Sequence, residues 1–240
     1  CNSCALLFQE NILNDSNMYL LYEKWISAEE SLNKKQHAEI GLFKTYIQEL
    51  ENTCQILNAR PHEIKMLEYG MGWGFWSNLA KSCNFDVTGV ELSRDRKDYA
   101  QKNGVRVIED ISQLVDEKFD YIYSNQVFEH IPDPRETLQK LAGLLSANGV
   151  IHIQVPNGKG MEKELQSSTW IAKKDALHPL EHINCFSRET LKILANQAGL
   201  SLLPPVYQPR LTGIKPFVGG LIRYLQDSRY STQVYLKKSN

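Results

Sequence analysis

The sequence predicts an α/β fold in which short strands and helices alternate and the strands form a mostly parallel sheet. An apolar segment from Ile64 to Tyr69 is followed by three glycines at alternate positions and by a periodic helix that begins at Phe75. Further apolar segments follow along the chain, with helix signals between them. Repeated strand–helix units of this kind form a parallel sheet that is covered on both faces.

The composition is that of an ordinary globular protein. Of 240 residues, 42% are hydrophobic and 23% are charged, and 27 basic against 28 acidic residues leave a net charge of −1. The length suits one α/β domain with an extension. The small net charge argues against nucleic acid as an obligatory partner, and no apolar run approaches the roughly 20 residues that cross a bilayer. Five scattered cysteines and the lack of a recognisable signal peptide predict reduced thiols and a cytoplasmic location.

The first 60 residues are predicted to form a separate N-terminal segment. Cys1 and Cys4 make a C-x-x-C, which is half of a tetrahedral zinc site, but the second pair is missing, so we expect no metal site. From about residue 17 to residue 58, apolar residues recur at three- and four-residue steps, which predicts helices that flank or cover a core. Pro61 ends this region because proline disfavours helix in the residue before it. We therefore divide the chain into residues 1–60 and a core domain over residues 61–240.

Strands and helices alternate along the core domain. The strands expected after Ile64–Tyr69 are 85–91, 104–108, 119–123 and 150–155, with helices over 94–102 and about 134–145. The stretch from Asn157 to Glu181 is polar and irregular, and a loop of this length in a compact domain is usually functional or mobile. A capped helix over 187–198 and strands over 200–206 and 230–237 complete the prediction, with a polar loop and a short helix between the two strands.

Three acids lie at the ends of the first three predicted strands: Glu68, Glu91 and Asp110. Glu91 follows Gly70 by 21 positions, a distance at which an acid that closes the second strand binds ribose hydroxyls. Asp110, one strand further, is placed to bind an exocyclic amine. Glu68 lies beside the glycine turn, where a carboxylate suits an ammonium group and would repel a pyrophosphate. A ligand with an amine, a ribose and an adenine but no phosphates is S-adenosylmethionine.

The region from Met66 to Asn157 resembles a class I S-adenosylmethionine-dependent methyltransferase. The similar segments are L-E-Y-G-M-G-W-G, V-T-G-V-E-L-S, F-D-Y-I-Y-S-N-Q-V-F-E-H-I-P-D-P and L-S-A-N-G-V-I-H-I-Q-V-P-N. A later segment, H-P-L-E-H-I-N-C-F-S-R-E-T-L, is similar to one in a small-molecule methyltransferase subgroup, often described with a zinc-ribbon-like N-terminus. The resemblance implies a Rossmann-like seven-stranded methyltransferase sheet, mostly parallel with an antiparallel last strand and the strand order 3-2-1-4-5-7-6, plus an N-terminal helical flank.

The resemblance also implies roles for individual residues. Glu68 would bind the methionine amine, Glu91 the ribose hydroxyls and Asp110 the adenine amine. The full set of implied cofactor-binding residues is Glu68, Tyr69, Gly70, Gly72, Gly74, Glu91, Leu92, Asp110, Ile111, Asn125 and Gln126. Two departures weaken the details: Trp73 stands where the family has a small residue, and Glu109 stands where a glycine usually precedes the third acid.

The predicted reaction transfers a methyl group from S-adenosylmethionine to a small-molecule acceptor and leaves S-adenosylhomocysteine. Such an enzyme mainly aligns its reactants and, for some acceptors, removes a proton. His130 and His182 are the candidate bases because histidine titrates near neutral pH; the structural alternative is that His130 caps a loop and His182 is a hydrogen-bond donor. The acceptor pocket is expected from Asn157–Cys185, the N-terminal helices and the loop over 207–229. The acceptor itself, for example a sugar or a secondary metabolite, its reacting atom and the oligomeric state cannot be predicted.

Other functions fit the sequence less well. A nicotinamide-dinucleotide oxidoreductase would use the glycine turn and Glu91, but the G-x-G-x-x-G pattern is absent. A non-catalytic S-adenosylmethionine-binding module of the same fold remains open, because a fold does not prove turnover. The H-x-x-E-H of His178 to His182 matches an inverted zinc-protease signature, which requires one helix, and Pro179 opposes such a helix.

Overall fold

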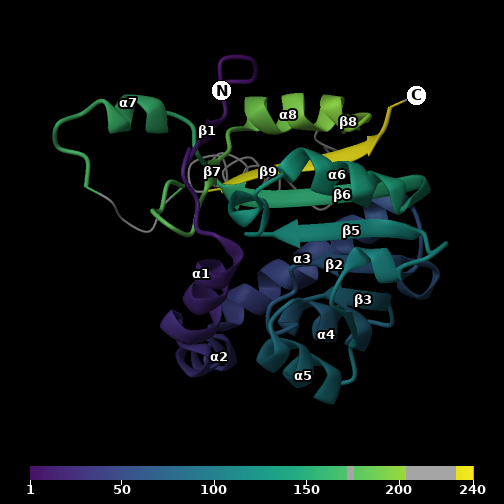
Figure 1. Ribbon diagram of the computed structural model, residues 1–240. Helices are drawn as coiled ribbons and strands as arrows, with labels where there is room; N and C mark the ends of the chain where they lie inside the picture. Colours follow the sequence, from purple (N-terminus) through teal and green to yellow (C-terminus); the bar gives the residue numbers. More distant parts are fainter. Residues whose placement is uncertain (172–175, 204–230, 240) are drawn as a thin grey trace, which may run out of the picture. The chain divides into compact units, whose positions relative to one another are not determined.

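The computed structural model describes residues 1–171, 176–203 and 231–239 (Figure 1). The described chain divides into two compact units. Asn11–Ser124 and Gly143–Val150 form the first, here called the glycine-turn unit. The second, here called the histidine unit, contains Cys1–Glu10, Asn125–Ala142 and the described residues from Ile151 onward. A division of the chain at residue 60 stays a prediction.

Seven strands form one sheet in the order β4-β3-β2-β5-β6-β9-β8. The pairing is parallel between β2 and β3, β2 and β5, and β3 and β4, whereas β9 is antiparallel to both β6 and β8. The predicted order 3-2-1-4-5-7-6 and the antiparallel last strand are therefore confirmed. The strands are β2 (Lys65–Tyr69), β3 (Asp86–Val90), β4 (Arg106–Ile108), β5 (Phe119–Asn125), β6 (Leu145–Pro156), β8 (Leu200–Leu202) and β9 (Ser231–Lys238).

In the glycine-turn unit, the helix start at Phe75 and the helix over 94–102 are confirmed, and the N-terminal range predicted as helical divides into several helices. Ser27 begins one of them, where its side chain accepts a hydrogen bond from the Glu30 N–H at 3.1 Å. Asn58 ends another helix in the left-handed conformation, which glycine adopts most readily and asparagine next. The helices are α1 (Asp15–Leu20), a π-helical turn (Leu21–Trp25), α2 (Ala28–Gln36), α3 (Ile40–Leu57), α4 (Phe75–Ser82) and α5 (Arg94–Lys102).

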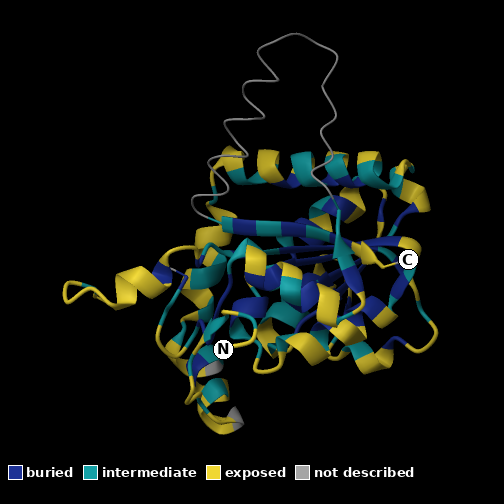
Figure 2. Ribbon diagram, turned by 90° about the horizontal axis from the view of Figure 1, so that it is seen from above, coloured by how far each residue is buried: buried dark blue, intermediate teal, exposed yellow. Residues whose placement is uncertain are grey.

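Aromatic side chains form much of the core of the glycine-turn unit. Trp76 of α4 is buried, and its ring centroid lies 4.7 Å from that of Tyr123 on β5. Tyr121, on the same strand, is also buried and donates a hydrogen bond to a carboxylate oxygen of Glu49 on α3. In Figure 2 the strands are mostly coloured as buried, and exposed residues concentrate in helices and loops. In the N-terminal helices, by contrast, several of the periodic apolar residues are exposed, among them Trp25 at 64% and Ile40 at 70%, so periodicity alone did not identify the buried faces.

The described part of the histidine unit contains elements that the sequence did not predict. Two short strands, β1 (Leu7–Phe8) and β7 (Asn184–Cys185), pair antiparallel, and α7 (Met161–Leu165) lies in the stretch that was predicted to be irregular. Strands of two residues are too short to show a recognisable alternation of apolar and polar residues. Their pairing partner is also far away in the sequence. The other helices, α6 (Pro134–Gly143) and α8 (Arg188–Gln197), agree with prediction, and Ser187 begins α8 with a capping box.

Some predictions fall outside the described residues. The loop and short helix expected over 207–229, residues 204–206 of one predicted strand and Tyr230 of another belong to this group. Among the described helices, none is both long enough and apolar enough to cross a membrane.

Candidate functional site

The glycine turn joins β2 to α4 through backbone conformations that only glycine adopts without strain. Gly70, Gly72 and Gly74 have φ values of 75°, 58° and 72°. A Cβ on Gly74 would lie 2.6 Å from Met71 Cε, whereas a Cβ on Gly72 would meet no atom within 4 Å. Space therefore remains open above the backbone at Gly72. This is the approach that a bound ligand needs.

Glu91, directly after β3, holds the glycine turn through its carboxylate. One oxygen accepts the Gly72 N–H at 2.8 Å, and the other accepts the Ser93 N–H at 2.8 Å. Burial raises the pKa of Glu91, and these backbone hydrogen bonds act in the opposite direction. Ser93 stands directly before α5, but its side chain makes no capping bond; its N–H instead donates to Glu91 and orients it. Each carboxylate oxygen keeps a lone pair for a ligand hydroxyl.

Glu68 is a buried acid on β2, in the same unit. Its Oε2 accepts a hydrogen bond of 2.5 Å from the hydroxyl of Ser77 on α4. Burial raises the pKa of Glu68 to about 7; the Ser77 hydrogen bonds and the charge of Lys35 lower it, and Glu91 raises it further. A carboxylate held in this way gains stability from an incoming cation, because a positive charge would offset the cost of burying its negative one.

Trp73, between Gly72 and Gly74, ties the turn to two helices. Its indole Nε1 donates to Ser31 Oγ of α2 at 3.1 Å. Its ring meets Tyr99 of α5 edge to face at a centroid distance of 5.5 Å, and the guanidinium of Arg96 lies 5.9 Å from the ring centroid. Trp73 is buried, so the residue that departs from the family pattern is a packing residue of the turn.

The remaining predicted cofactor residues of the glycine-turn unit are more exposed. Asp110 is exposed and uses one carboxylate oxygen to accept the Ser112 N–H at 2.7 Å, where it starts the short 3₁₀ turn Ile111–Gln113. Leu92 is 82% exposed, and Tyr69 and Ile111 are intermediate. Their contact with a cofactor stays a prediction.

Asn125 and Gln126, at the end of β5, belong to the histidine unit. Asn125 Oδ1 is buried and has no hydrogen-bond partner among the described residues. Gln126 has a φ of 57°, which is a strained conformation for a residue other than glycine, and its N–H donates to the Gln154 carbonyl at 2.8 Å. An unpaired amide oxygen beside a strained residue is typical of a ligand site.

His130 and His182, predicted from segments 52 positions apart, lie together in the histidine unit. Their ring centroids are 4.9 Å apart and roughly perpendicular, at 71°. The acid Glu129, which the sequence analysis did not single out, completes the cluster: one ligand atom from each of the three residues lies within 4.8 Å of the others. Burial raises the pKa of Glu129 to about 8. An acid inside the otherwise apolar run V-F-E-H-I was the signal available for it.

The H-x-x-E-H segment forms a turn rather than a helix. The His182 N–H donates to the His178 carbonyl at 2.9 Å, and Leu180 has a φ of 69°. His178 Nδ1 lies 3.2 Å from Glu181 Oε1. Because the helix that the inverted zinc-protease signature requires is not formed, this segment does not have the geometry of that signature.

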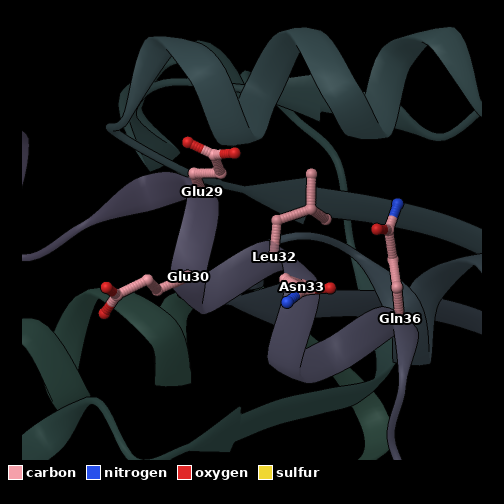
Figure 3. A pocket seen from close by; sticks show the side chains of 5 residues that line it. All are labelled: Glu29, Glu30, Leu32, Asn33 and Gln36. Atoms are coloured by element: carbon pink, nitrogen blue, oxygen red, sulfur yellow. The ribbon is translucent and has the colours of Figure 1, made fainter.

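A pocket of about 530 Å³ lies on α2 and is lined by Glu29, Glu30, Leu32, Asn33 and Gln36. Figure 3 shows Glu29, Leu32 and Gln36 projecting from one side of the helix, with Glu30 turned away from them. Four of these five side chains are polar and carry hydrogen-bonding oxygens. The helix is the same one that receives the hydrogen bond from Trp73.

The fold and the glycine turn define a class I methyltransferase-like α/β protein, and comparison with known proteins gives the family. The sequence pattern described as "Methyltransferase domain" matches residues 41–204. The chain therefore belongs to the methyltransferase-domain family.

Curated relatives match the chain over part of their length. A ubiquinone biosynthesis O-methyltransferase from Actinobacillus pleuropneumoniae serotype 5b is 30% identical over 107 residues, which are 39% of this chain and 46% of that protein. The C-methyltransferase NovU from Streptomyces niveus is 26% identical over 146 residues, or 58% of this chain and 33% of that protein. The matches thus span less than half of these two relatives.

Solved structures share the fold at low sequence identity. The plantazolicin methyltransferase BpumL, in complex with a triazolic desmethylPZN analog and SAH, has a TM-score of 0.64 at 16% identity, and the match covers 93% of this chain and 95% of that chain. Magnesium protoporphyrin IX methyltransferase from Synechocystis PCC 6803 has a TM-score of 0.61 at 13% identity, with coverage of 94% and 100%. These likenesses confirm the methyltransferase fold that the sequence predicts.

Proposed function

We propose that the chain is an S-adenosylmethionine-dependent methyltransferase that acts on a small-molecule acceptor. The observation that carries the proposal is the pairing of an open glycine turn with two buried acids. Glu91 accepts a hydrogen bond from the turn, and Glu68 lies buried in the same unit. Family membership and the SAH-bound structural neighbours support the same cofactor.

The residues present suit this cofactor. Gly72 leaves its backbone open to a ligand, Glu91 has lone pairs for ribose hydroxyls, and Glu68 would hold the methionine amine. Asp110 and Ile111 would receive the adenine, and Asn125 and Gln126 the methionyl part. The acids would repel a pyrophosphate, which argues against a nicotinamide dinucleotide.

Bound S-adenosylmethionine supplies a sulfonium-activated methyl group. The acceptor atom forms a bond to the methyl carbon, the carbon–sulfur bond breaks with its electron pair on sulfur, and S-adenosylhomocysteine is left. The chain has to align the acceptor, exclude water and, where the acceptor is protonated, accept its proton. We place the proton removal at the His130–His182 pair, because the two rings lie together.

The acceptor class follows from the relatives and from α2. Two of the curated relatives are named as a ubiquinone biosynthesis O-methyltransferase and a C-methyltransferase. Glu29, Asn33 and Gln36 line the α2 pocket with groups that hydrogen-bond hydroxyls. A hydroxylated acceptor such as a sugar or a secondary metabolite fits both observations. We place the protein in the cytoplasm, without nucleic acid or membrane as partner.

Calorimetric titration with S-adenosylmethionine and S-adenosylhomocysteine tests the cofactor. We expect micromolar binding, and a loss of about a hundredfold or more in Glu91→Ala, because two charge-assisted hydrogen bonds disappear. Glu109→Ala is the matched control, since Glu109 is an exposed acid paired with Lys97. Absence of binding by folded wild-type protein would overturn the proposal.

A second candidate is a binding module that keeps the cofactor without turnover. No observed contact favours it, but binding alone does not exclude it. A screen of hydroxylated acceptors with detection of S-adenosylhomocysteine separates the two. Product formation that depends on both Glu91 and the histidine pair supports the enzyme.

A further inference from the structure

The Glu129–His130–His182 cluster has the composition of a divalent-metal site. Two imidazoles and one carboxylate offer ligand atoms that lie within 4.8 Å of one another. Metal–nitrogen and metal–oxygen bonds of about 2.0–2.2 Å put opposite ligands at most about 4.4 Å apart. A small rotation of the side chains therefore closes the cluster around an ion.

Glu129 supplies the second, independent observation. Glu129 is only 1% exposed, and neither of its carboxylate oxygens has a hydrogen-bond partner among the described residues. His130 is a cationic candidate, but its Nε2 lies 3.9 Å from Glu129 Oε1, beyond hydrogen-bond distance. A buried acid without a partner is costly unless a cation or proton completes its surroundings.

The surroundings of His130 orient it as a metal ligand. Its Nδ1 lies 2.7 Å from the Glu181 carbonyl, and because a carbonyl only accepts, Nδ1 carries the proton. In the neutral ring, Nε2 then has the lone pair, and this nitrogen is on the side of Glu129. Metal-binding histidines usually donate their other N–H to a carbonyl or carboxylate in this way.

Hydrogen bonds also hold the two segments of the cluster together. Asn184 Nδ2 donates to the Ile131 carbonyl at 2.7 Å, which joins the residues after His182 to those after His130. Gln9 Nε2 donates to the His182 carbonyl at 3.1 Å and to the His178 carbonyl at 3.2 Å. The ligands thus come from a braced region of the histidine unit rather than from free side chains on its surface.

We propose that Glu129, His130 and His182 bind one divalent transition-metal ion, of the zinc or cobalt kind, and leave positions open for an oxygen ligand. Imidazole favours these ions over magnesium and calcium. The ligand set stands on its own geometry. Its role rests on the proposed function: the ion lowers the pKa of a bound acceptor hydroxyl, the proton passes to water, and the histidine pair acts through the metal rather than as a free base.

Cobalt(II) titration tests the site, in a Cys1→Ser/Cys4→Ser background so that the N-terminal thiols do not contribute. We expect one equivalent to bind, with visible d–d absorption and without thiolate charge-transfer bands. Affinity falls by about tenfold or more in His182→Ala and in the isosteric Glu129→Gln, and it weakens as pH falls, because protons compete for the ligands. His62→Ala, which removes an exposed histidine outside the cluster, leaves it unchanged.

Two further readouts separate the possible failures. Thermal melting with and without zinc checks that each variant folds, and only proteins with the intact cluster gain stability from the ion. S-adenosylhomocysteine binding, measured on the same samples, tests the proposed function separately. Cobalt binding that is absent, or that is unchanged in both cluster variants, would overturn the metal site while leaving the cofactor proposal untouched.

Discussion

Two buried acids, Glu68 in the glycine-turn unit and Glu129 in the histidine unit, differ in what the protein provides for them. Glu68 accepts a 2.5 Å hydrogen bond from Ser77, and burial raises its pKa to about 7. Glu129 has no hydrogen-bond partner among the described residues, and burial raises its pKa to about 8. The first acid is oriented by the chain, with its remaining lone pairs directed to a ligand. The second depends on a group that the described chain does not supply, and this contrast makes the histidine cluster a candidate ion site.

In the glycine-turn unit, which contains Glu68, substitutions in the glycine turn should have the largest effect on stability. Gly74→Ala should lower the free energy of unfolding by about 2–4 kcal/mol, because left-handed strain adds to a clash with Met71 Cε at 2.6 Å. Gly72→Ala has similar strain but open space around its Cβ, so we expect only about 1–2 kcal/mol. Urea denaturation measures both.

The difference between the two alanine variants isolates the steric part. Gly72→Ala should nevertheless weaken S-adenosylhomocysteine binding, since its new methyl group occupies the space that the ligand would use. Equal stability losses in the two variants would show that Met71 moves aside. Unchanged ligand affinity in Gly72→Ala would show that the ligand does not occupy the space beside Gly72.

Glu68→Gln tests whether Glu68 receives the positive charge of the cofactor. Wild-type Glu68 takes up its proton as pH falls through about 7, so affinity for S-adenosylmethionine should fall by up to about tenfold per pH unit below that value. The glutamine variant should bind weakly at pH 8 and lose this dependence. Titrations at pH 8, 7 and 6 give the slopes, and a variant that keeps the wild-type slope would assign the titration to another group.

The sequence predicted the glycine-turn unit better than the histidine unit for a physical reason. Glu68, the glycines and Glu91 occupy the ends of consecutive parallel strands, and such strand ends meet at one edge of a sheet. Their proximity is therefore encoded in local order. Ser77 and Ser31 were missed, because their hydrogen bonds depend on side-chain directions that periodicity does not specify.

In the histidine unit, the sequence identified His130 and His182 separately, and only the fold shows that they lie together with Glu129. The short strands β1 and β7 and the turn around Leu180 help form this region, and none of them has a recognisable pattern. We expected no metal site because we searched only for ligands closely spaced along the chain, such as Cys1 and Cys4. A site assembled across 52 positions has no spacing signature of that kind.

Ser77→Ala turns Glu68 into an acid that resembles Glu129. With its hydroxyl partner removed, the pKa of Glu68 should rise further, and the free energy of unfolding should fall by about 1–3 kcal/mol at pH 8. The raised pKa means that the unfolded state releases its proton first as pH rises, so the loss is present above about pH 7. It shrinks toward pH 5, where Glu68 is protonated in the folded state of both the wild type and the variant.

Ser82→Ala, at the end of the same helix, is the control for this change. Its hydroxyl donates to the backbone carbonyl of Asn78 at 2.9 Å rather than to a carboxylate. Denaturation curves at pH 8 and pH 5 should be displaced equally in this control. A pH-independent loss in Ser77→Ala would show that the serine acts by packing.

The smallest expected effect concerns the hydrogen bond between Trp73 and Ser31, which ties the glycine turn to α2. Trp73→Phe keeps most of the aromatic contact with Tyr99 but removes the indole N–H, and Ser31→Ala removes the acceptor. Each should weaken S-adenosylhomocysteine binding severalfold, because α2 no longer steadies the turn. In a double-mutant cycle the coupling energy should be about 0.5–1.5 kcal/mol, the net value of one such bond. Additive losses would mean that the two residues act independently, and that the helix bearing the polar pocket is not coupled to the turn that we assign to the cofactor.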